Sequence, residues 1–84
     1  MSTRQDWKFL GSTSEGKAFQ LGGLDVWKHE WRDTQERAYV KDPIYHQDFT
    51  FHVYEISSTT QVVTFAAGEF SNCMWGFFVR GPTA

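Results

Sequence analysis

The alternation of apolar and polar residues predicts strands most clearly in the second half of the chain. Residues 49–54 place Phe49, Phe51 and Val53 on one face and Thr50, His52 and Tyr54 on the other. This period of two is typical of a strand with one buried face. Two more apolar runs, 62–70 and 73–79, lie on either side of Ser71-Asn72 and predict a β-hairpin.

A two-residue turn at Ser71-Asn72 would fix which residues of this hairpin face each other. On one face it pairs Phe70 with Cys73, Gly68 with Trp75, Ala66 with Phe77 and Thr64 with Val79. On the other face it pairs Glu69 with Met74, Ala67 with Gly76 and Phe65 with Phe78. Small residues then lie across from the largest rings, as cross-strand packing favours. Because both faces are apolar, the sheet must be covered twice, by curling into a barrel or by a second subunit.

The first half of the chain is less regular. Short extended runs at 8–10 and 17–21 flank a surface turn at 11–16, and Gly22-Gly23 then interrupts the chain. These breaks predict short strands rather than a long element.

Residues 26–40 fit either a helix or a hairpin. In a helix near 25–37, Asp25 would be the N-cap. In a hairpin, the chain turns through 33–36 and Trp31 faces Ala38 on the returning strand. The first strand of that hairpin has one face made of Trp27, His29 and Trp31. We favour the hairpin, because the helix would run into a proline segment without a glycine to end it.

Together these patterns predict one all-β domain spanning 1–84. We expect a small, mostly antiparallel curled sheet or open barrel of about six strands, with an α+β domain containing a helix near 25–37 as the alternative. Eight Phe, four Trp and three Tyr supply most of the core material. A domain of this size buries only about 60–65% of its unfolded surface, so we expect a homodimer.

The distribution of charge argues against nucleic-acid binding. The chain carries eight basic and ten acidic residues, a net charge of −2. In the second half, Arg80 is the one basic residue beside three acidic ones. Binding to phosphates requires several clustered cations, so we expect no nucleic-acid partner.

The single cysteine, Cys73, excludes an intrachain disulfide and with it a disulfide-stapled secreted domain. Its predicted neighbours are apolar, which predicts a buried, inert thiol rather than a nucleophile. The first residues contain no apolar run typical of a signal peptide, and no run approaches the roughly 20 residues needed to span a bilayer. We therefore expect a cytoplasmic protein without a membrane partner.

Two stretches of the second half carry a resemblance. One is Val40-Lys41-Asp42-Pro43-Ile44-Tyr45-His46-Gln47 followed by Phe51-x-Val53-Tyr54, and the other is Phe65-Ala66-Ala67-Gly68-Glu69-Phe70-Ser71-Asn72 with Trp75-Gly76-Phe77. Together they resemble a group of small uncharacterised bacterial proteins that end in a similar Gly-Glu-Phe-Ser-Asn hairpin. The resemblance covers about the last half of the chain and implies a bacterial origin and a β-rich fold. It implies no activity and no catalytic residues.

Three histidines invite comparison with a metal site, since imidazoles and a carboxylate can hold zinc. His46, Asp48 and His29 would be its ligands, but no spacing matches a known His-rich motif. Surface or hydrogen-bonded histidines explain the pattern better, and we expect no metal and no other cofactor.

The tryptophans offer a second candidate site. A face made of Trp27, His29 and Trp31 could stack on a flat ligand or anchor a protein partner, because tryptophan serves both purposes. The other surface that the protein could present is a mouth near Tyr45, His46 and Glu69. A hydrogen-bonded or ion-paired side chain near the turn explains Glu69 better than a general acid does.

These observations predict a non-enzymatic binding or interaction module whose partner is a second copy or another protein, with a small ligand also possible. A small metal-dependent hydrolase with its site at a subunit interface is one alternative. An accessory subunit of a larger assembly is another, and the composition does not separate it from the first.

Overall fold

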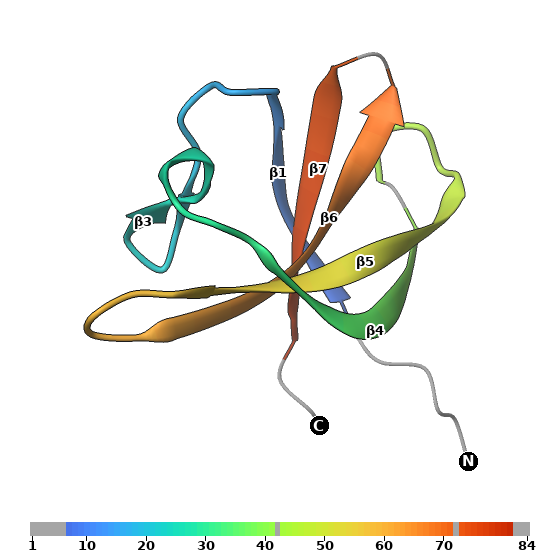
Figure 1. Ribbon diagram of the computed structural model, residues 1–84. Coiled ribbons are helices and arrows are strands. Elements are labelled where there is room, and N and C mark those ends of the chain that lie inside the picture. Colours follow the sequence, from blue (N-terminus) through green and yellow to red (C-terminus); the bar gives the residue numbers. More distant parts are fainter. Residues whose placement is uncertain (1–6, 42, 72, 82–84) are drawn as a thin grey trace.

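The computed structural model describes residues 7–41, 43–71 and 73–81 as an all-β structure (Figure 1). Its strands are β1 (Trp7–Ser14), β2 (Gln20–Leu21), β3 (Leu24–Asp25), β4 (Arg32–Lys41), β5 (Asp48–Ser57), β6 (Val62–Ser71) and β7 (Met74–Arg80). One short 3-10 turn, η1 (Val26–Lys28), lies between β3 and β4. None of the described residues belongs to a helix long and apolar enough to cross a membrane. The all-β prediction is confirmed.

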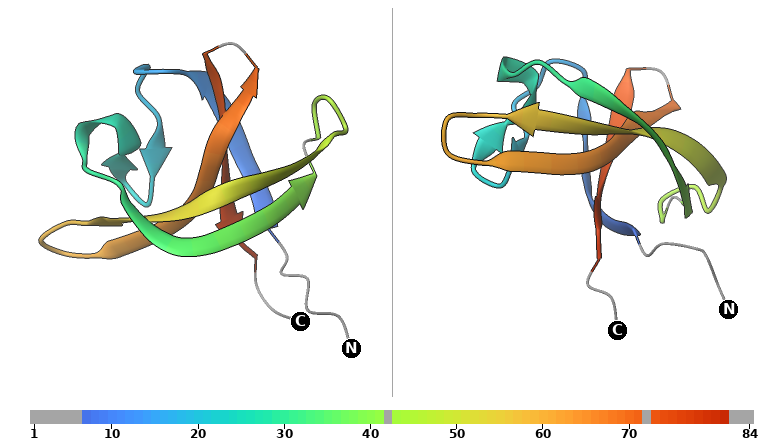
Figure 2. Two further views of the ribbon diagram at one scale, coloured as in Figure 1. Left: turned by 45° about the vertical axis from the view of Figure 1, so that its right-hand side comes forward. Right: turned by 60° about the horizontal axis from the view of Figure 1, so that its bottom comes forward.

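The main sheet has five strands in the order β1-β7-β6-β5-β4, all antiparallel, and β2 pairs with β3 in a separate two-stranded ladder. The sheet is strongly coiled, so that β4 and β5 run across the direction of β1 and β7 (Figures 1 and 2). Its two edge strands, β1 and β4, approach each other but form no ladder within the described residues. The predicted curled sheet or open barrel is therefore confirmed in its open form.

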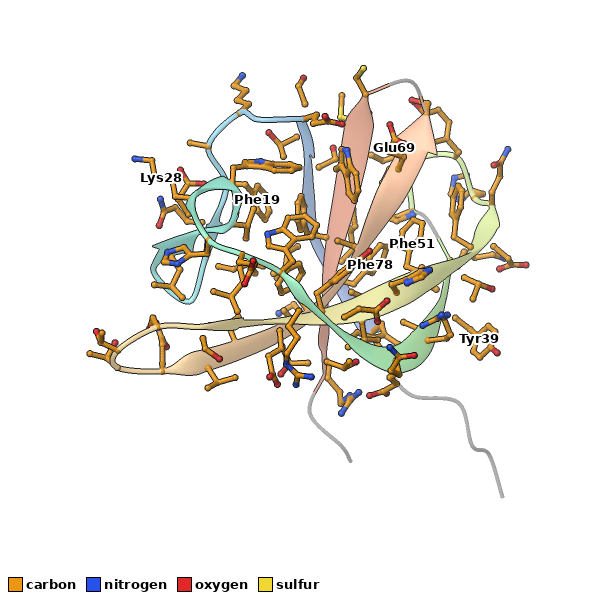
Figure 3. All side chains as sticks on the ribbon, in the orientation of Figure 1. Phe19, Lys28, Tyr39, Phe51, Glu69 and Phe78 are labelled. Atoms are coloured by element: carbon orange, nitrogen blue, oxygen red, sulfur yellow. The ribbon has the colours of Figure 1, made fainter. Side chains whose placement is uncertain are left out.

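The inside of the curl is filled by aromatic rings, which form what we call the inner core. All five strands contribute to one core: Ala38 and Val40 from β4, Phe49, Phe51 and Val53 from β5, Ala66 and Phe70 from β6, Phe78 from β7, and Trp7 and Phe9 from β1. Phe51 and Phe78 lie together inside the curl (Figure 3). Because rings occupy this space, curling covers one apolar face of the sheet, as predicted.

The opposite face of the sheet is covered by the chain's own first half. Leu21 and Val26 are buried against Ile56, Phe65 and Phe77, and the rings of residues 19, 27 and 31 pack around them. The Phe19 ring stacks on Phe77 with centroids 4.6 Å apart. The second apolar face is thus covered by residues 19–31, which we call the covering segment, and the packing between this segment and the sheet is the outer core.

The predicted hairpin at 26–40 is wrong, and so is the alternative helix near 25–37. Asp25 accepts hydrogen bonds from the backbone N–H of Phe19 and of Trp27, at 3.4 and 3.1 Å, which turns the chain into η1. Residues 32–41 then form one strand paired with β5, in which Ala38 faces Phe51 and not Trp31. The expected turn at 33–36 is a bulge within β4, because the ladder with β5 resumes beyond it.

The β6–β7 hairpin exists, but its predicted register is wrong by one residue. Glu69 faces Trp75 and Ser71 faces Met74, so Phe70 is an extra residue bulged out of β6. The pairs beyond this bulge are Gly68 with Gly76, Ala67 with Phe77 and Ala66 with Phe78. Phe65 and Phe77 therefore share one core, whereas the prediction separated them. Asn72, half of the expected turn, lies outside the described residues.

The expected turn at 11–16 is also too long. β1 continues to Ser14, and a register shift between Phe9 and Gly11 accommodates the glycine within its ladder to β7. The chain turns only after Ser14, whose carbonyl accepts a hydrogen bond from the Lys17 N–H at 3.0 Å.

Candidate functional site

The bulge in β4 is held by side chains of its own residues. Gln35 has a φ of 74°, a left-handed conformation that is unfavourable for a residue with a side chain. Its backbone N–H donates to Asp33 Oδ1 at 2.8 Å, and the Glu36 N–H donates to Thr34 Oγ1 at 3.3 Å. Thr34 Oγ1 in turn donates to the Val53 carbonyl of β5 at 2.8 Å. The bulge is therefore a defined feature that sets the position of Asp33.

We expect Gln35→Gly to raise the free energy of unfolding by about 0.5–1 kcal/mol, because glycine adopts this φ without steric cost. Denaturant unfolding of the purified proteins measures the change. Gln20→Gly is the matched control: Gln20 is also exposed, but it lies in β2 without a positive φ, where glycine should cost a similar amount. Equal destabilisation by the two substitutions would contradict this account of the bulge.

Asp33 and His52 form the closest acid–imidazole contact of the described residues. His52 Nδ1 lies 2.9 Å from Asp33 Oδ2. Hydrogen bonds from His52 and from the Gln35 N–H lower the pKa of Asp33, so this group is a carboxylate at neutral pH. A carboxylate only accepts hydrogen bonds, which makes Nδ1 the protonated nitrogen. In the neutral ring, Nε2 then carries the lone pair.

Arg37 and Tyr54 complete this group, which we call the β4–β5 cluster: Asp33, Arg37, His52 and Tyr54. Arg37 is the cross-strand partner of His52, and its Nη1 lies 3.9 Å from Asp33 Oδ1. The Tyr54 ring stacks on His52 at 6.0 Å and packs against Trp31 at 5.2 Å. Burial, followed by the nearby charge of Asp33, raises the pKa of Tyr54, so its phenol stays protonated. The side chains of Asp33, Arg37 and His52 in this cluster are 35%, 40% and 47% exposed.

The predicted face of Trp27, His29 and Trp31 takes a different form. Trp27 lies in η1 and Trp31 just before β4, with ring centroids 5.2 Å apart. Trp31 Nε1 donates to the Val26 carbonyl at 2.7 Å, which fixes this ring over the sheet. Both tryptophans are half-buried in the packing around Phe77, and His29 ends η1. The two rings meet because the chain turns, not because they share a strand.

The second predicted group, Tyr45, His46 and Glu69, is divided between the two sides of the sheet. Tyr45 and His46 are exposed in the connection between β4 and β5, where the Tyr45 ring lies 6.4 Å from Phe70 of the inner core. Glu69, exposed near the end of β6 (Figure 3), faces Trp75, which packs against the outer core. Tyr45 and Glu69 therefore approach different cores.

The candidate metal ligands lie apart in the fold. His46 and Asp48 lie at the β4–β5 connection, while His29 follows η1 on the opposite side of the molecule (Figure 1). Among residues 7–41, 43–71 and 73–81, no three His, Cys, Asp or Glu side chains are grouped so that they could hold a metal ion.

Cys73 was predicted to be buried, and this prediction is wrong. The residue is exposed and has a φ of 60°, at the turn between β6 and β7. The physical reason is the bulge at Phe70, which moves Cys73 from the ladder into the turn.

Sequence reasoning missed the pairing of Asp33 with His52. These residues are 19 positions apart, and the bulge and the β4–β5 register bring them together. The signal available was the alternation of His52 and Tyr54 on one strand face, but the hairpin prediction places Asp33 in a turn.

Comparison with protein-family models, curated proteins and solved structures found no match to this chain. The resemblance to the small bacterial group thus stays a prediction.

Proposed function

We propose that the protein is a non-enzymatic binding module whose β4–β5 hairpin contacts another protein or a second copy of the same chain. One observation carries the proposal. Three of the five large apolar side chains that are exposed in the described residues lie between positions 39 and 45. They are Tyr39, Ile44 and Tyr45, with exposed fractions of 67%, 51% and 50%.

The position of these side chains favours binding over chance exposure. Both faces of the sheet already have their own cores, so none of the three is needed to complete the fold. Tyr39 projects from β4 at one side of the molecule (Figure 3). Tyr45 is pre-positioned by its edge-on contact with Phe70, which lowers the entropy lost on binding. Tyrosine is enriched among the residues that dominate binding energy at interfaces.

The setting we propose for this module is the bacterial cytoplasm, where the exposed thiol of Cys73 stays reduced. An accessory subunit of a larger assembly would use the same hairpin, because its assembly contact also needs exposed apolar side chains. Identifying the bound protein distinguishes a binding module with a separate partner from an accessory subunit of a larger assembly.

Photo-crosslinking at Tyr39 tests the proposal. We would replace Tyr39 with a benzophenone amino acid, irradiate cells of the source organism and identify the linked protein by mass spectrometry. Val62, with an exposed fraction of 59%, is the matched control position on a different strand. We expect one defined adduct from position 39 and none from 62. The same adducts at both positions, or none at 39, would refute the proposal.

The affinity of the identified pair provides a second measurement. Tyr39→Ala should weaken binding about tenfold or more, while Val62→Ala should change the Kd by less than about threefold. A native mass spectrum of the untagged protein distinguishes a second copy from another protein as the occupant.

A further inference from the structure

The imidazole of His52 is held in one orientation by its carboxylate partner. Its Nδ1–H donates to Asp33, which leaves Nε2 as the nitrogen that faces a reagent. The side chain is 47% exposed, which leaves the ring open to reagents in solution. Tyr54 stacks on one face of the ring, with an interplanar angle of 15°. An oriented and accessible imidazole is thus built into the sheet.

The neighbours of His52 indicate which kind of group would bind there. On one side its cross-strand partner is Arg37, whose side chain is 40% exposed. On the other side its partner is Ala67, which adds neither bulk nor charge. A guanidinium binds the oxygens of phosphate in a bidentate geometry and repels cations. Asp33 occupies the Nδ1 side of the ring, and Arg37 Nη1 donates to the Glu36 carbonyl at 3.1 Å. The remaining N–H groups of Arg37 therefore favour an anionic phosphoryl group beside the ring.

We propose that His52 is a phosphoryl-acceptor site, in which Nε2 takes a phosphoryl group from a small donor while Arg37 pairs with the phosphoryl oxygens and Asp33 positions the ring. Asp33 is a positioning residue, since it acts through the imidazole. The site does not rest on the binding function proposed above, because the reaction needs no bound protein.

The step balances with phosphoramidate as the donor. The Nε2 lone pair attacks phosphorus and forms an N–P bond, while the P–N bond of the donor breaks. The donor nitrogen is already protonated as –NH3+ in the zwitterionic form of phosphoramidate, so it leaves as ammonia. The imidazole becomes an imidazolium that keeps its Nδ1 proton, and the Asp33 carboxylate stabilises this positive charge. No oxidant, reductant or metal is consumed.

The experiment treats the folded protein with phosphoramidate and follows each histidine by phosphorus NMR and peptide mapping under conditions that preserve phosphohistidine. His46 is an internal control, because it is exposed in the connection between β4 and β5, outside the β4–β5 cluster. We expect His52 to react at least about fivefold faster than His46, and at Nε2, since one cation about 4 Å away changes a rate by about that factor even at the full screening of bulk water.

Two variants separate the proposed roles from a merely structural one. Arg37→Gln should bring the His52 rate down to that of His46, while Arg32→Gln, which removes an arginine paired with Glu55, should leave it unchanged. Asp33→Asn, tested on protein whose circular dichroism spectrum matches that of the unmodified chain, should shift part of the product to Nδ1. Equal rates at His52 and His46 in the unmodified protein, or reaction of His52 mainly at Nδ1, would overturn the proposal.

Discussion

Replacing Phe77 with alanine is expected to lower the free energy of unfolding by about 3–5 kcal/mol, the usual cost of removing a buried ring. Phe77 has no exposed surface and lies at the centre of the outer core. Four rings have centroids within 6.0 Å of the centroid of the Phe77 ring, those of Phe19, Trp27, Trp31 and Phe65. They come from both the covering segment and the sheet, so alanine would leave a cavity between the two.

A domain of this size has a total stability of about 4–13 kcal/mol, so Phe77→Ala could leave little folded protein to measure. Phe77→Leu keeps most of the volume and should cost about 1–2 kcal/mol, measured by denaturant unfolding. Tyr39→Ala is the control, because an exposed ring should change stability by less than about 0.5 kcal/mol. Similar losses for Tyr39→Ala and Phe77→Leu would mean that the outer core does not hold the fold together.

The parts of the fold that follow from local alternation could be predicted. The period of two in residues 49–54 corresponds to β5, and the apolar runs at 62–70 and 73–79 correspond to β6 and β7. The prediction that both faces of the hairpin are covered is also confirmed, with one core on each side. Such patterns are visible in the sequence because each strand must bury its own apolar face.

The register could not be predicted, since a single bulged residue reverses it. The bulge at Phe70 shifts the pairing of β6 and β7 by one, and a shift of one exchanges the two faces. The covering segment was missed for a related reason. Alternation of Trp27 and Trp31 fits a strand, but hydrogen bonds to the Asp25 side chain turn the chain at η1. Neither effect leaves a periodic signal in the sequence.

The candidate site depends on those same irregularities. Asp33 reaches His52 because β4 bulges at Gln35, in a conformation that few residues with side chains adopt. No motif spacing predicts such a pair, since the register of two strands and a bulge determine the distance between the two side chains. The exposed residues of the β4–β5 connection were only partly anticipated: Tyr45 and His46 were candidates, whereas Tyr39 was not.

Gly68→Ala is expected to lower the free energy of unfolding by about 2–3 kcal/mol, a typical cost of overpacking a core. The Phe51 ring lies against the Gly68 backbone, and an added Cβ would lie 2.3 Å from Cδ1 and 2.9 Å from Cγ of that ring. Phe51 is 6% exposed inside the curl, so its ring has no free space to enter. Small residues across from large rings were predicted for this hairpin, and glycine does make room for a ring, but for Phe51 of β5 rather than for Trp75.

The comparison with Gly76→Ala identifies the cause of this loss. There an added Cβ would lie 2.1 Å from Cζ, the tip of the Phe70 ring, and Phe70 is only half-buried. Because Phe70 is less buried than Phe51, shifting its ring loses less packing, so Gly76→Ala should cost less, about 1–2 kcal/mol. Adding Phe51→Leu to Gly68→Ala should recover part of the loss, so that the double variant is more stable than the sum of the single changes predicts. Strict additivity would show that alanine at 68 acts on the backbone and not on the Phe51 ring.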